Sequence, residues 1–254
     1  MGLRPLEESN WLEVDARREE ELTLKKRLLI EHRDTVVAVR DSGETASAEL
    51  LELVCDNLAT YHPEIVRDVV AHEHPIVQAS LMVQEDLCVL VHDEQWRLAA
   101  ACVCFPSRWS LENKIGTTLD AIHDPVPGYA EELSRPTNAF FERLKPERPF
   151  WRLNWTLLDD ASLFQPAGRR QSAKGDPDQW FFRVERQTLR LLPVTRAAVF
   201  TIHTYVASVQ QLRSEHEDFV EHLLVALDSA SPAVKDYKGW VGVADRLRET
   251  LGES

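Results

Sequence analysis

The stretch that decides the fold is Phe181-Phe182-Arg183-Val184-Glu185-Arg186-Gln187-Thr188-Leu189-Arg190-Leu191-Leu192. Apolar, aromatic and β-branched side chains dominate it, and it ends at Pro193, which cannot pair within a central strand. A second apolar run follows at residues 197–206 after a short connection. Two long strand candidates so close in sequence predict neighbouring antiparallel strands.

Further strand and helix candidates precede and follow this pair. Residues 35–39 form a short β-branched run, and residues 87–91 and 97–105 predict a hairpin joined by His92-Asp93-Glu94-Gln95. Residues 151–158 indicate another strand. Helical spacing of apolar residues occurs over residues 11–33, 46–61, 111–122, 129–144, 209–227 and 241–251.

This order of elements predicts an α+β fold. About five or six strands, mostly in hairpin order, lie between helical groups, which favours an antiparallel sheet over a doubly wound parallel one. The 254 residues fit one large domain. We therefore expect a single domain over residues 1–254, with helical extensions at about 1–33 and 208–254.

The chain is strongly acidic, because 29 Lys and Arg residues stand against 42 Asp and Glu residues, a formal net charge of −13. Such a surface repels phosphate backbones and anionic lipid heads, so nucleic acid and membrane surfaces are poor partners, whereas an amine fits better. Residues 1–40 lack the apolar stretch of a signal peptide, and no run approaches the roughly 18 apolar residues of a membrane helix. We expect a soluble protein that is not exported.

The four cysteines do not form a metal-binding pattern. They are Cys55, Cys88, Cys102 and Cys104, and none forms a CxxC pair. Three lie in apolar strand-like runs, where a thiol behaves as a small hydrophobic side chain. We therefore expect no zinc or iron–sulfur cluster on these residues, and reduced thiols indicate the cytoplasm.

The first candidate site residue is His123, in the segment Ile122-His123-Asp124-Pro125-Val126-Pro127-Gly128-Tyr129. It falls at the end of a predicted helix and directly before two prolines, which leave the backbone few conformations. A histidine held in this way can ligate a metal. An imidazolium at this position can equally cap the helix by interacting with its C-terminal dipole, and spacing does not distinguish the two.

A second group of candidates lies on the predicted strand Trp151-Arg152-Leu153-Asn154-Trp155. Alternation places Arg152 and Asn154 on one face and the apolar side chains on the other. Arg152 can bind a carboxylate, such as a cofactor propionate, through its bidentate fork. An ordinary strand with a solvated polar face explains the same pattern.

A third group shares one face of the opening stretch: Arg183, Glu185 and Gln187. If Glu185 is partly enclosed, it can hold a substrate ammonium and orient its N-methyl carbon. The same three side chains can instead form a salt-bridged surface ladder, worth under about 1 kcal/mol. The strand period does not decide between these interpretations.

Together these segments resemble the haem-dependent oxidative N-demethylases over roughly residues 5–206. The resemblance is carried by short stretches that occur in the family's order: Gln84-Glu85-Asp86-Leu87-Cys88, Phe105-Pro106-Ser107-Arg108-Trp109, Lys114-Ile115-Gly116, Ile122-His123-Asp124-Pro125-Val126-Pro127-Gly128-Tyr129, Arg152-Leu153-Asn154-Trp155, Arg183-Val184-Glu185-Arg186-Gln187-Thr188-Leu189 and Phe200-Thr201-Ile202-His203-Thr204-Tyr205.

The resemblance implies a PAS-like haem monooxygenase subunit. Its cofactor would be haem b, and its reaction the oxidation by dioxygen of a methyl group on a small secondary amine such as dimethylamine, which yields formaldehyde and a primary amine. Electrons would come from NADPH through separate flavin and [2Fe-2S] subunits, and this chain has no motif for either cofactor. By the same resemblance, His123 becomes the proximal iron ligand and Glu185 the substrate anchor. Pocket-lining or propionate-binding positions become Arg152, Asn154, Arg183, Lys114 and Tyr129.

One position departs from the family's pattern, which implies arginine where His203 stands. A titratable ring there can alter the substrate pocket or a propionate contact, and it makes His203 a rival iron ligand. We count His203 with Glu185 and Arg183 among the candidate catalytic residues. Two other functions remain open: a PAS-like haem or gas sensor without turnover, and a small-molecule-binding module that has lost the cofactor.

Overall fold

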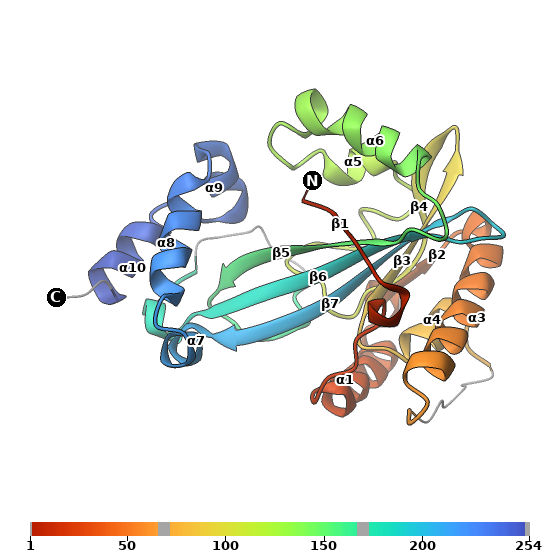
Figure 1. Ribbon diagram of the computed structural model, residues 1–254, viewed down its shortest axis with the longest axis horizontal. Helices are drawn as coiled ribbons and strands as arrows, with labels where there is room; N and C mark the ends of the chain where they lie inside the picture. The colour runs from red at the N-terminus through yellow and green to blue at the C-terminus, as the bar shows by residue number, and fades with distance from the viewer. Residues whose placement is uncertain (1, 66–71, 167–172, 252–254) are drawn as a thin grey trace.

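A computed structural model describes residues 2–65, 72–166 and 173–251. Within these ranges, seven strands form one antiparallel sheet in the order β1-β5-β6-β7-β3-β4-β2 (Figure 1). The expected α+β class with a PAS-like antiparallel sheet is confirmed, although the sheet has more strands than the five or six expected. One strand that the sequence did not predict is the two-residue β1, which pairs with β5 at the sheet edge.

The strands predicted over residues 181–192 and 197–206 are confirmed as β6 and β7, which pair from Phe181 opposite Ser208 to Leu191 opposite Ala198. The predicted hairpin is also present but tighter than expected, because Glu94 alone, with a φ of 56°, separates the paired residues Asp93 and Gln95. The strands span β1 (Arg4–Pro5), β2 (Val37–Val39), β3 (Asp86–Asp93), β4 (Gln95–Cys102), β5 (Phe150–Leu158), β6 (Phe181–Leu191) and β7 (Ala198–Ser208).

Most helices are shorter or more interrupted than their apolar spacing predicts, whereas α3 covers its whole predicted range. The first helix begins only at Arg18, because Trp11, Glu13 and Asp15 before it contact β6 and β7 instead. The helix expected over residues 111–122 is confined to α5, with Gly116 at a φ of 77° before it. None of the described helices has the length and apolar character needed to cross a bilayer. Their bounds are α1 (Arg18–Glu31), α2 (Arg33–Val36), α3 (Glu44–Tyr61), α4 (Pro75–Ser80), α5 (Leu119–His123), α6 (Ser134–Glu142), α7 (Val209–Glu215), α8 (Phe219–Ser229), α9 (Pro232–Lys238) and α10 (Val243–Leu251).

The sheet has two faces with separate cores, because successive side chains of a strand point to opposite sides. On the α1 face, Val89 and Val199 pack with residues of α1, α3 and α4. On the α5 face, Cys88, Leu189 and Ala198 pack with residues of α5 and α6. Figure 1 shows the two helical groups on opposite sides of the sheet.

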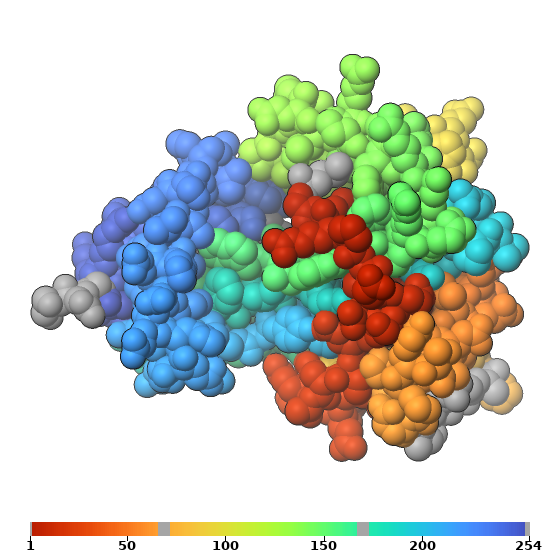
Figure 2. Space-filling model, viewed as in Figure 1, coloured from red at the N-terminus to blue at the C-terminus, as the bar shows by residue number. Residues whose placement is uncertain are grey.

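The C-terminal helices gather at one end of the long strands β5, β6 and β7 (Figure 1). A third core joins them to the sheet, with Leu157, Trp180, Leu227 and Trp240 buried in it. Figure 2 shows a hollow between these helices and the first residues of the chain, with strands of the sheet visible inside it. The sheet surface at this end is therefore not covered by α1, α3 or α6.

Candidate functional site

The α5 face carries four of the predicted site residues. Arg152 and Asn154 come from β5, and Arg183 and Glu185 come from β6. Asn154 lies directly opposite Glu185, and Arg152 lies opposite Gln187. Because residues two apart share a face, the pairing brings the predicted substrate anchor and the predicted propionate ligands together on one surface.

His123 is the last residue of α5, and its ring is fixed in one tautomer. Nδ1 lies 2.8 Å from the carbonyl oxygen of Leu119. A carbonyl oxygen only accepts, so Nδ1 carries the proton and Nε2 keeps its lone pair. Among the described residues, Nε2 contacts no hydrogen-bond partner. This is the usual arrangement of a histidine that ligates a metal through Nε2.

Burial also favours the uncharged form of this ring. Desolvation lowers the pKa of His123 by more than the hydrogen bond to Leu119 raises it, and the positive charges of Arg152 and Lys114 lower it further. The imidazole is therefore neutral at neutral pH, as ligation requires.

Two of the residues predicted to bind the cofactor, Tyr129 and Lys114, instead contact His123 or the residue before it. The Tyr129 ring stacks on the imidazole, with centroids 4.8 Å apart and an interplanar angle of 12°. Its hydroxyl donates to Asp120 at 3.1 Å, and Nζ of Lys114 donates to the carbonyl oxygen of Ile122 at 2.9 Å. Both side chains thus position the histidine segment, and their part in propionate binding stays a prediction.

The Glu185 carboxylate is held on one side only. Nδ2 of Asn154 and Nε2 of Gln187 both donate to Oε2, at 3.2 and 2.9 Å. The nearest charged neighbour of Oε1 is Nε of Arg183 at 3.8 Å, which is too far for a hydrogen bond. The side chain is only 12% exposed. Within the described part of the chain, Oε1 therefore keeps its capacity to accept a hydrogen bond.

The two arginines of this face play different parts. Arg183 is fully buried and donates to the carbonyl oxygens of Phe105 at 2.5 Å and Leu163 at 3.2 Å, so its guanidinium anchors loops to the sheet. Arg152 donates through Nε to Oε1 of Gln187 at 2.7 Å. No acceptor in the described residues contacts the two terminal nitrogens of Arg152, which leaves them for a ligand carboxylate.

The positive charge of Arg152 acts on both Glu185 and His123. Burial lowers the pKa of Arg152, and the charge of Glu185 acts against that effect. The positive charge of Arg152 in turn contributes to the lowered pKa of His123. One charged side chain thus acts on both the predicted iron ligand and the predicted substrate anchor.

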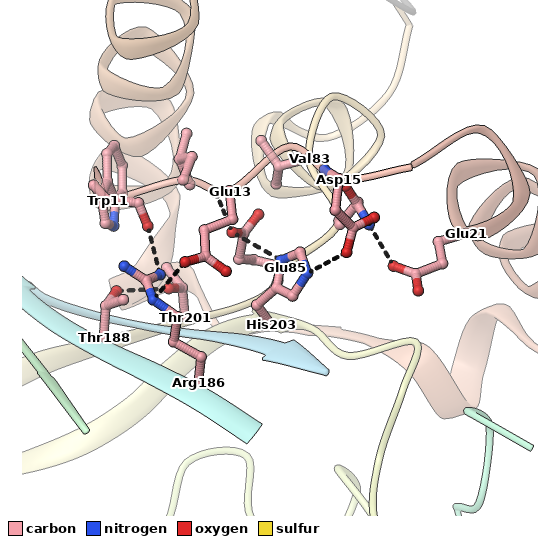
Figure 3. A network of polar contacts seen from close by, with 12 residues as sticks. Trp11, Glu13, Asp15, Glu21, Val83, Glu85, Arg186, Thr188, Thr201 and His203 are labelled. Atoms are coloured by element: carbon pink, nitrogen blue, oxygen red, sulfur yellow. Dashed lines mark hydrogen bonds and ion pairs between the residues drawn. The ribbon is translucent and has the colours of Figure 1, made fainter. Parts of the chain in front are cut away.

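The structure separates His203 from this group. His203 lies opposite Arg186 in the β6–β7 pairing, whereas Glu185 lies opposite Thr204, so His203 points to the α1 face. Its Nδ1 is 3.2 Å from Oε1 of Glu85, and its Nε2 is 3.3 Å from Oδ2 of Asp15 (Figure 3). Burial lowers the pKa of His203, but Glu85, and after it Asp15 and Glu13, outweigh burial and raise it to about 9. The ring is an imidazolium at neutral pH, and neither nitrogen remains for iron.

The carboxylates around His203 hold the N-terminal segment against the sheet (Figure 3). The Glu13 carboxylate accepts from Nε of Arg186 at 2.9 Å and from the Tyr205 hydroxyl, while its backbone N–H donates to Glu85 at 2.8 Å. Gln84 donates to Asp15 and Glu21, each at 2.8 Å. Sequence reasoning missed this network, because Glu13 and Asp15 fall inside the helix predicted over residues 11–33.

We call the contacts of His203 with Glu85 and Asp15, and of Arg186 with Glu13, the N-terminal clamp. This clamp predicts how the free energy of unfolding depends on pH. The folded pKa of His203 lies above its ordinary value of 6.5, so its stabilisation is complete below about pH 6.5 and is lost as the pH rises through about 9. At about 1.4 kcal/mol per pKa unit, the loss approaches 3 kcal/mol. Urea unfolding at pH 6.5 and 9.5 should show wild type losing more stability than His203→Gln. Parallel losses in the two proteins would contradict the clamp.

The fold and this surface define a PAS-like α+β protein with a fixed neutral histidine and a half-satisfied carboxylate on one sheet face. The chain matches the family model described as haem-dependent oxidative N-demethylase, alpha subunit-like, over residues 2–69 and 66–248, and it therefore belongs to this family. The description associates the family with haem and with oxidative N-demethylation, and the word subunit implies a larger assembly.

The residues present fit a haem better than a bare metal ion. The described residues contain no group of three or more His, Cys, Asp or Glu side chains placed to hold a metal. A haem iron already has four ligands from its macrocycle and needs one protein nitrogen, which Nε2 of His123 can supply. The unused nitrogens of Arg152 suit the propionates of such a group.

Proposed function

We propose that this protein is a haem-dependent monooxygenase that removes a methyl group from a small secondary amine such as dimethylamine. The observation that carries the proposal is the Glu185 carboxylate. It is nearly buried, two amides hold one of its oxygens, and the other oxygen is available to an ammonium on the same face as Arg152 and the histidine segment. A buried carboxylate with unused acceptor capacity selects a cationic ligand.

The proposed reaction consumes one amine, one dioxygen, two electrons and two protons. One oxygen atom enters the N-methyl carbon, the C–N bond breaks, and formaldehyde and the primary amine are released; the second oxygen leaves as water. When bound, haem would supply the activation of dioxygen. Nε2 of His123 would hold its iron, and Arg152 and Lys114 would hold its propionates.

The chain's own residues would bind and orient the amine. Oε1 of Glu185 accepts a hydrogen bond from the substrate N–H, which fixes the direction of the N-methyl carbon. Asn154 and Gln187 prevent the carboxylate from rotating, and the anchored guanidinium of Arg183 lies 3.8 Å from its other oxygen.

Electrons would reach this subunit from elsewhere. We propose separate flavin and [2Fe-2S] subunits that use NADPH, in agreement with the family's subunit description. We also propose a cytoplasmic location, supported by four cysteines that are all free thiols. In this proposal, residues 1–254 act as one haem-binding domain.

The test is a visible absorption spectrum of protein expressed with added haem precursor, recorded oxidised, reduced and with dimethylamine. We expect a stoichiometric haem band that shifts when the amine is added. Formaldehyde should then appear when reductant and dioxygen are supplied. A haem band indifferent to amines would favour the sensor function, and a colourless protein would reject the cofactor.

A further inference from the structure

The end of α9 is attached to β5 beside the candidate amine site. Lys238 is the last residue of α9, and Gly239 follows with a left-handed φ of 68°, which turns the chain sharply. Trp240 then stacks on Trp155 of β5, with ring centroids 4.3 Å apart and an interplanar angle of 18°. Trp240 is buried, so this contact fixes where the Lys238 side chain begins.

From this position, Lys238 reaches the side chain next to Glu185. Its Nζ donates to Oδ1 of Asn154 at 2.9 Å and to the carbonyl oxygen of Trp155 at 2.8 Å. The ammonium also lies over the Trp240 ring, 4.7 Å from its centroid, and the Trp155 ring, 5.6 Å from its centroid. Lys238 is therefore held by both the strand and its own helix end.

The chemistry of an ammonium decides which way the Asn154 amide faces. An ammonium only donates, so the amide must turn its oxygen to Lys238 and its NH₂ group to Glu185. The second amide follows the same rule: Arg152 donates to Oε1 of Gln187, whose NH₂ group then faces Glu185. Two cations thus orient two amides, and both amides donate to the same oxygen, Oε2.

We propose that Lys238 is a positioning residue for the amine anchor. It fixes the Asn154 amide, which holds Oε2 of Glu185 and leaves Oε1 for the substrate ammonium; this inference rests on the proposed function. The C-terminal helices then belong to the substrate site, although none of their residues needs to touch the amine. Lys238 lies beyond the short motifs that carry the sequence resemblance, which end near residue 206, but within residues 66–248 that the family model matches.

The test is to titrate the haem-loaded protein with dimethylamine. The absorption spectrum and calorimetry both measure binding of the amine. Lys238→Met keeps the apolar stem over the indoles and removes the donor. We expect it to retain the haem band and to bind the amine roughly five- to tenfold more weakly. Lys238→Arg, which keeps a cationic donor, should recover most of the affinity. Lys235→Met, on the same helix but with its Nζ directed to the carbonyl oxygen of Asp228 in an exposed contact, should bind as wild type does.

A double-mutant cycle separates positioning from simple loss of charge. Removal of a positive charge alone would strengthen ammonium binding, the opposite of the expected result. If Lys238 acts through Asn154, Lys238→Met should add no more than about twofold in an Asn154→Ala background. Wild-type affinity in Lys238→Met, or additive losses in the double variant, would overturn this inference alone. A wild-type protein that binds haem but ignores the amine would overturn the proposed substrate with it.

Discussion

Replacement of His123 by alanine is expected to remove most of the haem while the protein still unfolds cooperatively. The substitution deletes the ring nitrogen whose lone pair is unused among the described residues, and it also deletes the stacking contact with Tyr129. The segment keeps its other supports, including the Lys114 bond to the backbone, so we expect a stability loss of only about 1–2 kcal/mol. The haem-to-protein ratio from the absorption spectrum and a urea unfolding curve measure the two effects.

A matched control for this experiment is His222→Ala, on the exposed side of α8, which should retain haem at the wild-type ratio. Added imidazole should restore part of the haem band to His123→Ala, because a small ligand can occupy the space of the lost ring. If His123→Ala instead keeps stoichiometric haem with an unchanged spectrum, another group holds the iron and the assignment is wrong.

The substitution Glu185→Gln is expected to leave the haem band intact and to abolish the spectral response at dimethylamine concentrations well below the wild-type half-saturation point. Asn154 and Gln187 donate to the Oε2 position, so the new amide must place its oxygen there. Its NH₂ group then takes the position of Oε1 and offers donors to a ligand that also donates. Loss of a buried charge-assisted hydrogen bond, about 1.5–3 kcal/mol, corresponds to a decrease in affinity of roughly ten- to a hundredfold.

The control for Glu185→Gln is Glu131→Gln, which removes the same charge from an exposed position. Titration of both variants with dimethylamine separates the local effect from the change in net charge. An amine response in Glu185→Gln equal to that of the control would show that this carboxylate is not the anchor.

Local sequence patterns were enough to predict six of the seven described strands and part of the candidate site. Alternation along β5 and β6 correctly grouped Arg152 with Asn154 and Arg183 with Glu185, because it depends only on neighbouring residues. The position of Asn154 opposite Glu185 depends on the register between two strands, and these two residues are 31 positions apart in the chain. That register follows from packing of the whole sheet, so no local pattern could supply it.

The features that sequence reasoning missed depend on contacts between distant parts of the chain. Whether His203 shares a face with Glu185 is decided by the β6–β7 register, and a shift of one residue would reverse it. α9 is a seven-residue helix with no buried residues, so it has no apolar stripe that predicts it or the position of Lys238.

The N-terminal clamp has a consequence for the order in which the chain assembles. Asp15 and His203 are 188 residues apart, and Glu8 and Arg190 are 182 apart. On a ribosome, the first segment is synthesised long before its partners on β6 and β7 exist, and closing so large a loop is slow. The segment therefore stays exposed to solvent until then, and its many carboxylates favour a hydrated, extended chain over early collapse. It can dock only after the last strand of the sheet is in place.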